Sequence, residues 1–173
     1  YIGPSLTEAV YRKGTIGRAK DHLEATAFAI TDSLADIDGK AFVSVNKALV
    51  TQASSAIPVI PLYISLLYKI MKEEGIHEGC IEQIQRLYQE RLFTGNEIPV
   101  DEKGRIRVDD WEMRSDVQEK IAKLWGEAVT ENLSEIGDLE GYRKDFYNLF
   151  GFDVDGVDYE VDTNEMVNIE SIT

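Results

Sequence analysis

Only one segment of this chain has the clear composition of a β-strand. Residues 41–46 (Ala-Phe-Val-Ser-Val-Asn) are short and rich in β-branched side chains, and Gly39 and Asn46 bound them. Five or six other segments have helical patterns. A lone parallel strand would leave its backbone donors and acceptors unpaired, so a free-standing α/β domain needs more strands than this. We therefore expect the strands that complete the sheet to lie upstream of this sequence.

Residues 15–34 form the longest helical pattern. Thr15 is expected to cap its start, and apolar side chains then recur at steps of three or four residues. This period predicts a helix with one buried face, made by Ala19, Leu23, Ala27, Ile30 and Leu34. Because this helix precedes the strand, the two together indicate an α/β unit.

The other helices are expected after the strand. Residues 62–72 are apolar nearly all round, which predicts a helix that is enclosed by other elements or borders an apolar cavity. A tight turn at Asp101–Gly104 predicts a small hairpin between residues 98–100 and 106–108. Further helices are predicted over 81–93, from a cap at Asp109 or Asp110 to Trp125, over 127–136 and over 139–150.

The formal net charge of −14 argues against nucleic acid as a partner, because phosphate binding needs a basic face. The acidic C-terminal segment, residues 151–173, has seven acids and no Lys or Arg, and we interpret it as solvated. The first twenty residues run the other way. This segment is basic, and its basic side chains would attract a phosphorylated ligand. They belong to Arg12, Lys13, Arg18 and Lys20.

The single cysteine, Cys80, cannot form an internal disulfide, which fits a reducing cytoplasm. The most apolar stretch, residues 56–71, contains Pro58, Pro61 and Lys69 and is shorter than the roughly 20 residues of a membrane helix. It predicts a buried helix and no membrane span. We therefore expect a cytoplasmic protein.

Tyr11 and Lys20 are the main candidates for a chemical site. Nine steps of about 100° would place their side chains on opposite faces of a single helix. The stretch Gly14-Thr15-Ile16-Gly17 interrupts any such helix. If a new helix begins at Thr15, Lys20 lies in its early turns and Tyr11 in the preceding loop, so both side chains can point into one site.

The order of tyrosine, lysine, helix, strand and loop resembles a known family. Tyr11-Arg-Lys-Gly-Thr-Ile-Gly-Arg-Ala-Lys20 looks like the Tyr-x8-Lys signature of the trans-2-enoyl-CoA and enoyl-acyl-carrier-protein reductases, which are related to short-chain dehydrogenases. The resemblance covers nearly the whole chain and runs through residues 42–51, 58–72, 77–83, 105–111 and 141–156.

The resemblance implies the C-terminal half of a doubly wound, Rossmann-type α/β fold with added C-terminal helices. Residues 1–75 would hold the Tyr/Lys helix, the last core strand and the substrate-lining helix; residues 76–150 would be helical additions with the small hairpin. The family's glycine-rich phosphate loop has no match in this sequence. We therefore expect the missing N-terminal dinucleotide-binding half to be a necessary partner, and the 173-residue chain alone to be inactive.

The resemblance also implies an activity. NADH would reduce the 2,3 double bond of a trans-2-enoyl thioester, as in fatty acid synthesis. Negative charge then develops on the thioester oxygen, where the hydroxyl of Tyr11 would donate a hydrogen bond or a proton. Lys20 would favour the phenolate and orient the nicotinamide ribose. Tyr11 and Lys20 are thus the expected catalytic residues.

Four further residues match the family's binding positions. Tyr1 matches a tyrosine at the substrate carbonyl. Leu49, Val50 and Thr51 match the loop that meets the nicotinamide carboxamide, whose donors and acceptors suit main-chain groups and a hydroxyl. We expect an enoyl-CoA or enoyl-ACP substrate and a monomer when complete. The acyl chain length, the thioester carrier and the choice between NADH and NADPH stay open.

A second tyrosine–lysine pair would indicate a different class of enzyme. Tyr68 and Lys72 have the Tyr-x3-Lys spacing of ordinary short-chain dehydrogenases, and Ser55 precedes them as their catalytic serine does. In that fold the Tyr-Lys helix comes before the strand whose loop touches nicotinamide, whereas Tyr68 follows the only strong strand. A carbonyl or hydroxyl dehydrogenase using this pair is one alternative, and a non-catalytic helical interaction module is another.

Three other groups of polar residues have plainer interpretations. His77, Glu78 and Cys80 are metal-ligand types, but they crowd one turn and lack a fourth partner of matching spacing, so we expect no metal site. Asp153-Val-Asp-Gly156 lacks the further acids of a calcium loop and is interpreted as a solvated turn. His22 is interpreted as a surface residue.

Overall fold

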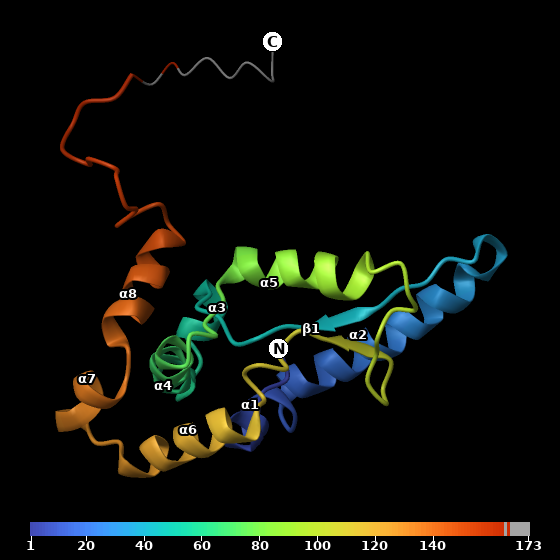
Figure 1. Cartoon of the computed structure of the whole chain (residues 1–173), viewed down its shortest axis with the longest axis horizontal. Coiled ribbons are helices and arrows are strands. Elements are labelled where there is room, and N and C mark those ends of the chain that lie inside the picture. The colour runs from blue at the N-terminus through green and yellow to red at the C-terminus, as the bar shows by residue number, and fades with distance from the viewer. Residues whose placement is uncertain (165, 167–173) are drawn as a thin grey trace.

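The computed structural model describes residues 1–164 and 166 and is mainly helical, with one small parallel sheet (Figure 1). β1 (Val43–Val45) lies inside the predicted strand, which is confirmed. It pairs in parallel with β2 (Arg105–Arg107), and Ser44 lies opposite Ile106 in the register. The predicted combination of helices with a parallel strand is therefore confirmed at this coarse level.

The predicted hairpin between residues 98–100 and 106–108 is wrong. Its turn does form, because the Gly104 N–H donates to the Asp101 carbonyl at 2.9 Å and Gly104 has a φ of +72°. The segment after the turn pairs with β1 instead of folding back on residues 98–100. The pairing with β1 leaves Ile106 only 2% exposed, and the burial of β-branched side chains stabilises a short strand.

The chain begins with a 3-10 turn, η1 (Ser5–Thr7), and the short helix α1 (Glu8–Tyr11). α2 (Thr15–Ser33) confirms the predicted long helix, although Gly14 and not Thr15 occupies the cap position. A second 3-10 turn, η2 (Ala35–Ile37), follows it.

The predicted burial of the apolar stripe on α2 is wrong. Leu23 is 56% exposed and Ile30 is 44% exposed, and neighbouring Phe28 is 56% exposed. A periodic pattern shows which face of a helix is apolar, but that face is buried only where another element packs on it. Among the described residues, α2 contacts chiefly α1, β1 and η2, and these leave the stripe open.

The core of the protein is built around α4 (Ile60–Glu73), which confirms the predicted enclosed helix. It follows the short α3 (Gln52–Ser55). Pro61 lies at the start of α4, where the missing N–H of proline removes no helical hydrogen bond. Nine α4 side chains are buried, and each large apolar one stabilises the fold by about 1.5–3 kcal/mol.

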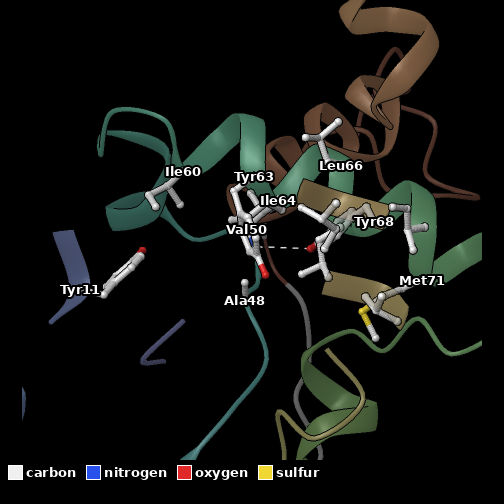
Figure 2. Packing of buried hydrophobic residues seen from close by; sticks show 13 residues of the cluster. Tyr11, Ala48, Val50, Ile60, Tyr63, Ile64, Leu66, Tyr68 and Met71 are labelled. Atoms are coloured by element: carbon white, nitrogen blue, oxygen red, sulfur yellow. Dashed lines mark hydrogen bonds between the residues drawn. The ribbon is translucent and has the colours of Figure 1, made fainter. Parts of the chain in front are cut away.

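α6 (Ser115–Glu127) and α8 (Leu139–Asn148) pack against α4. Figure 2 shows the resulting cluster, with Val50 beside the side chains of α4 and Tyr11 at its edge. The short η4 (Thr130–Asn132) and α7 (Leu133–Ile136) connect α6 with α8.

The predicted cap of α6 at Asp109 or Asp110 is wrong, because α6 begins at Ser115. Both aspartates bind arginines instead. Asp109 accepts from Arg107 at 2.7 Å, and Asp110 accepts from Arg86 at 2.7 Å. Both partners of these bonds are charged, and charge-assisted bonds of this kind are roughly twice as strong as bonds between neutral groups.

α5 (Cys80–Arg86) continues as a π-helical turn, η3 (Leu87–Leu92), close to the predicted bounds. In Figure 1, α5 and α2 lie on opposite sides of the two strands. Gln83 of α5 joins the ends of both strands, since its Oε1 accepts from the Lys47 N–H at 2.9 Å and its Nε2 donates to the Val108 carbonyl at 3.0 Å. This buried amide fixes the start of the loop that leaves β1.

The described part of the acidic C-terminal segment, residues 151–164, is exposed throughout, as the solvated interpretation requires. Two of its acids, Glu165 and Glu170, lie outside the described residues. None of the helices in the described ranges combines the length and the hydropathy needed to cross a membrane.

Candidate active site

Tyr11 and Lys20 come together because the chain reverses sharply between α1 and α2. Tyr11 is the last residue of α1, and Lys20 lies early in α2. Gly17 makes the reversal possible, since a Cβ on Gly17 would lie 2.1 Å from the carbonyl oxygen of Arg12. The Lys20 Nζ consequently lies 5.6 Å from the centroid of the Tyr11 ring.

Tyr1 completes this cluster. Its ring meets the Tyr11 ring edge to face, with centroids 4.8 Å apart and an interplanar angle of 89°. Tyr11 is 7% exposed. Burial raises the pKa of the Tyr11 hydroxyl above its ordinary value, and the negative charge of Glu112 raises it further. The Tyr11 hydroxyl therefore keeps its proton at neutral pH and can act as a donor.

Leu49, Val50 and Thr51 follow β1 after three intervening residues, in the loop at the carboxyl end of the strand, where parallel sheets commonly bind ligands. Val50 is buried in the same apolar cluster as Tyr11. The Thr51 hydroxyl caps α3, because its Oγ1 accepts from the Ser54 N–H at 3.0 Å. A cavity of about 590 Å³ opens beside the three residues and is also lined by Tyr68 and by parts of α5 and α8.

Tyr68 lies on the other side of Val50 from Tyr11 in the view of Figure 2. It is 1% exposed, and its hydroxyl oxygen accepts a hydrogen bond from the Val50 N–H at 3.3 Å. Burial raises the pKa of Tyr68 above its ordinary value. Lys72 lies 5.5 Å from the Tyr68 ring centroid, and its ammonium pairs with Asp138 at 2.5 Å.

Ser55, the third member of the alternative set, is not brought to Tyr68. Its hydroxyl donates to the Gln52 carbonyl at 2.8 Å within α3, at an exposed position. The Tyr68–Lys72 spacing therefore reflects packing on α4.

Glu112 is a buried residue of this region that the sequence did not predict. It is 0% exposed, and its Oε1 accepts from the Tyr63 hydroxyl at 2.7 Å and from the Tyr1 hydroxyl at 3.1 Å. Its Oε2 accepts from the Ala48 N–H at 2.7 Å. Burial raises the pKa of Glu112, against the opposing effect of these donors. The residue lies in the acidic run Asp109-Asp110-Trp111-Glu112, where nothing in the sequence distinguishes it from a solvated acid.

Lys47 is a second residue that the sequence did not predict. It is 2% exposed, its Nζ donates to the Ala48 carbonyl at 3.0 Å, and it lies 4.6 Å from the Tyr68 ring centroid. Burial lowers the pKa of Lys47 to about 8, although the charge of Glu112 acts in the other direction. The only sequence feature that could have pointed to Lys47 is its position directly after the predicted strand, residues 41–46.

The residue types considered for metal binding have other partners. Glu78 accepts from Arg86 at 2.7 Å, and His77 meets the Tyr68 ring with centroids 4.5 Å apart. Across residues 1–164 and 166, no three His, Cys, Asp or Glu side chains gather in a way that would hold a metal ion. Asp155 of the acidic turn pairs with Lys144 at 2.7 Å.

Two family models match the chain. Residues 1–93 match the trans-2-enoyl-CoA reductase catalytic region, which includes Tyr1, Tyr11, Lys20 and the loop after β1. Residues 100–163 match a model described as the enoyl reductase FAD binding domain.

The residues in the second match do not fit FAD. A flavin dinucleotide is commonly held by a glycine-rich turn between a strand and a helix, whereas residues 105–114, from β2 to the start of α6, contain no glycine. The arginines of β2 are not free for a diphosphate either, since Arg105 pairs with Asp101 and Arg107 with Asp109, both at 2.7 Å.

Known proteins align with almost the entire chain. An enoyl-[acyl-carrier-protein] reductase [NADH] of Flavobacterium psychrophilum is 82% identical over 99% of the chain. The trans-2-enoyl-CoA reductase of Treponema denticola, solved in complex with NAD, is 56% identical over 94% of the chain with a TM-score of 0.88. A Clostridium trans-2-enoyl-CoA reductase in complex with NADH is 52% identical over 95% of the chain with a TM-score of 0.91.

The chain spans 43% of the length of the Flavobacterium psychrophilum relative, and 41% and 42% of the two solved chains. Within that span, the matched family model includes the tyrosines and the lysine that the fold brings together. The chain therefore belongs to the trans-2-enoyl-CoA reductase family.

Proposed function

We propose that this chain supplies the catalytic tyrosine and lysine of an enzyme that uses NADH to reduce trans-2-enoyl thioesters in fatty acid synthesis. The observation that carries the proposal is the cluster of Tyr1, Tyr11 and Lys20 at the base of α2, next to the loop after β1. Two tyrosine rings and one ammonium converge there, and a thioester carbonyl needs such donors when negative charge develops on its oxygen.

Tyr11 is the proton donor in this proposal. When bound, NADH would supply a hydride to the carbon β to the carbonyl, and the electrons of the double bond move to the thioester oxygen; a proton added at the α carbon of the resulting enol then gives the saturated thioester. Because burial raises the pKa of Tyr11, its hydroxyl enters the reaction protonated and can donate to that oxygen. The nearby ammonium of Lys20 stabilises the charge that Tyr11 acquires. Tyr1, whose ring meets the Tyr11 ring edge to face, donates to the same carbonyl.

The chemistry of the loop fits a nicotinamide. Leu49, Val50 and Thr51 offer main-chain groups and one hydroxyl beside a cavity of about 590 Å³, and a carboxamide needs both donors and acceptors. Lys20 is a suitable donor for the ribose hydroxyls. In this proposal Lys20, Leu49, Val50 and Thr51 are the cofactor-binding residues.

The phosphate-binding part of the enzyme lies outside these 173 residues in this proposal. The two-stranded sheet supports this view, because isolated parallel sheets of this size are not stable by themselves. We propose that the chain is the C-terminal half of a doubly wound fold, with residues 1–75 in its Rossmann-type domain, residues 76–150 as helical additions and residues 151–173 as the acidic segment. The complete enzyme would act as a cytoplasmic monomer on enoyl-CoA or enoyl-ACP, and the chain alone would be inactive.

The dehydrogenase alternative finds less support. The Tyr68 hydroxyl accepts from the Val50 N–H, and the Lys72 ammonium is bonded to Asp138, so each group has a structural partner. Ser55 bonds within its own helix.

A substrate comparison tests the proposal. A complete enzyme that contains this sequence is incubated with NADH and either crotonyl or acetoacetyl thioester, and the loss of NADH absorbance is followed. We expect rapid oxidation with the crotonyl thioester alone. Oxidation with the ketoacyl thioester alone would instead support the dehydrogenase, and no oxidation with either would support a non-catalytic module.

A further inference from the structure

Glu112 connects the two sides of the proposed site. It lies between β2 and α6 and is 0% exposed. A carboxylate at such a depth is costly unless donors surround it, so its hydrogen-bond partners indicate what holds it there. Those partners are the hydroxyls of Tyr1 and Tyr63 and the N–H of Ala48.

We propose that Glu112 is a positioning residue that holds the substrate tyrosine, Tyr1, and the start of the cofactor loop, Ala48, at a fixed separation. This inference rests on the proposed function, because it takes the roles of Tyr1 and of residues 49–51 from there. In this proposal Glu112 does not touch the reacting atoms. Its effect on the reaction passes through Tyr1 and through the backbone of the loop.

One of the three hydrogen bonds is longer than the other two, which indicates how the residue works. The bonds from Tyr63 and from Ala48 are both 2.7 Å, whereas the bond from Tyr1 is 3.1 Å. A tyrosine hydroxyl has one hydrogen and cannot donate to Glu112 and to a substrate carbonyl together. When a thioester binds, the Tyr1 hydrogen turns to its carbonyl, and the two shorter bonds keep the carboxylate in place.

The surroundings of Glu112 limit where Tyr1 can move. Gln118 donates to the backbone carbonyl of Glu112 at 2.7 Å and to the Tyr63 hydroxyl at 3.2 Å. Tyr63 is itself 0% exposed on α4. Glu112 is thus fixed from both α4 and α6, and until a thioester binds it holds the Tyr1 ring edge-on to Tyr11.

The first experiment replaces Glu112 by glutamine in the complete reductase. An amide has the size of the carboxylate, but its NH₂ group cannot accept the Ala48 N–H. We expect kcat/KM for crotonyl thioester, corrected for folded protein, to fall about 100-fold, as small displacements at active sites do. We also expect the dissociation constant of NADH to rise about tenfold through the loop. Glu119→Gln makes the same chemical change at an exposed position on α6 and should leave both values unchanged.

A double-mutant cycle separates positioning from a general effect on folding. If Glu112 acts through Tyr1, then Tyr1→Phe removes the hydroxyl on which it acts, and adding Glu112→Gln should reduce kcat further by much less than it does alone. Effects that multiply fully in the double variant would overturn the proposal, as would a Glu112→Gln enzyme with wild-type kinetics.

Tyr63→Phe is the second variant if Glu112→Gln does not fold. Without the Tyr63 hydroxyl, Tyr1 is the remaining donor to Oε1 and is held more strongly. We expect KM for the thioester to rise several-fold while the NADH dissociation constant stays unchanged; an unchanged KM would overturn the proposal. A wild-type enzyme that does not turn over crotonyl thioester refutes the proposed function itself, whereas an active wild type with an unaffected Glu112→Gln variant refutes only the role of Glu112.

Discussion

Two tyrosine–lysine pairs in this chain have almost the same geometry and very different surroundings. The ammonium lies 5.6 Å from the ring centroid in the Tyr11–Lys20 pair and 5.5 Å in the Tyr68–Lys72 pair. The Tyr68 hydroxyl bonds to a backbone N–H, and the Lys72 ammonium bonds to Asp138. Tyr11 instead meets the ring of a second tyrosine where the chain reverses between two helices.

This difference shows that the spacing of a tyrosine and a lysine does not identify a catalytic pair. Both spacings place an ammonium over a ring, so the hydrogen-bond partners of each hydroxyl and each ammonium have to be compared as well. The Tyr68 hydroxyl serves the fold, since it holds the backbone of the loop after β1 against α4. Tyr11 occurs beside that loop, and its neighbours suit a developing oxyanion.

The largest difference is expected between the two tyrosines. Tyr11→Phe in the complete enzyme keeps the ring and deletes the hydroxyl, so turnover of crotonyl thioester should fall about 10²- to 10⁴-fold while NADH still binds. Steady-state kinetics with a fluorescence titration of NADH measures both. Tyr68→Phe is the matched variant and should change turnover only modestly. Loss of turnover in Tyr68→Phe alone would assign the reaction to the second pair.

The second largest difference is expected between the two lysines, in their effect on NADH binding. Lys20→Ala is expected to weaken NADH binding by about 1.5–3 kcal/mol, as for a lost charged hydrogen bond, and to reduce kcat as well. Lys72→Ala loses an ion pair with Asp138 that is partly exposed, which is worth about 0–1 kcal/mol, so NADH binding should hardly change. Titrations of both variants with NADH give the comparison. Equal losses would mean that the two ammonium groups share one ligand.

Thr51 caps α3 and, in the proposal, also binds NADH, and these two roles can be separated. Thr51→Val is expected to weaken NADH by about 1 kcal/mol and, through the lost cap of α3, to reduce the free energy of unfolding by about 1 kcal/mol. Thr51→Ser keeps the hydroxyl and should preserve both quantities. Calorimetry and denaturant unfolding measure them. A Val variant that is less stable but binds NADH normally would leave Thr51 with the capping role alone.

The smallest effect concerns the surroundings of the second pair. Burial, then the charges of Lys47 and Lys72, lower the pKa of His77 from the ordinary 6.5 to about 4. The unfolded chain therefore binds a proton first as pH falls, and the free energy of unfolding should decline between about pH 6.5 and 4. Urea unfolding at several pH values should show a shallower decline for His77→Gln than for wild type. Identical declines would exclude His77 as the cause.

The sequence predicted the helices and the position of β1 because those depend on local periodicity. The prediction was wrong where burial or strand pairing depends on a partner that is distant in the sequence. Leu23 and Ile30 have the spacing of a buried stripe and are nevertheless exposed, because burial needs an element to pack on them. The turn at Gly104 was predicted correctly, but the strand after it pairs with β1, which no local pattern indicates.

The candidate site shows the same division. Tyr11, Lys20, Tyr1 and residues 49–51 could be named because their order resembles a family, and the fold places the first three in one cluster. Glu112 could not be predicted as a site residue, because it lies close to Asp109 and Asp110 and has the same composition signal as a solvated acid. Only the packing of α4 and α6 around it makes it a buried acceptor.

The parallel pairing of β1 with β2 has a consequence for how the chain acquires its structure. Val43 must find Arg105 across an intervening stretch that contains α3, α4 and α5. The loop-closure entropy of that search is lost before any sheet bond forms, whereas helices with local contacts form within about a microsecond. The helices should therefore appear first and the strands should pair late. During that interval the edges of Val43–Val45 are open to other chains, so aggregation on refolding is expected to begin at this strand.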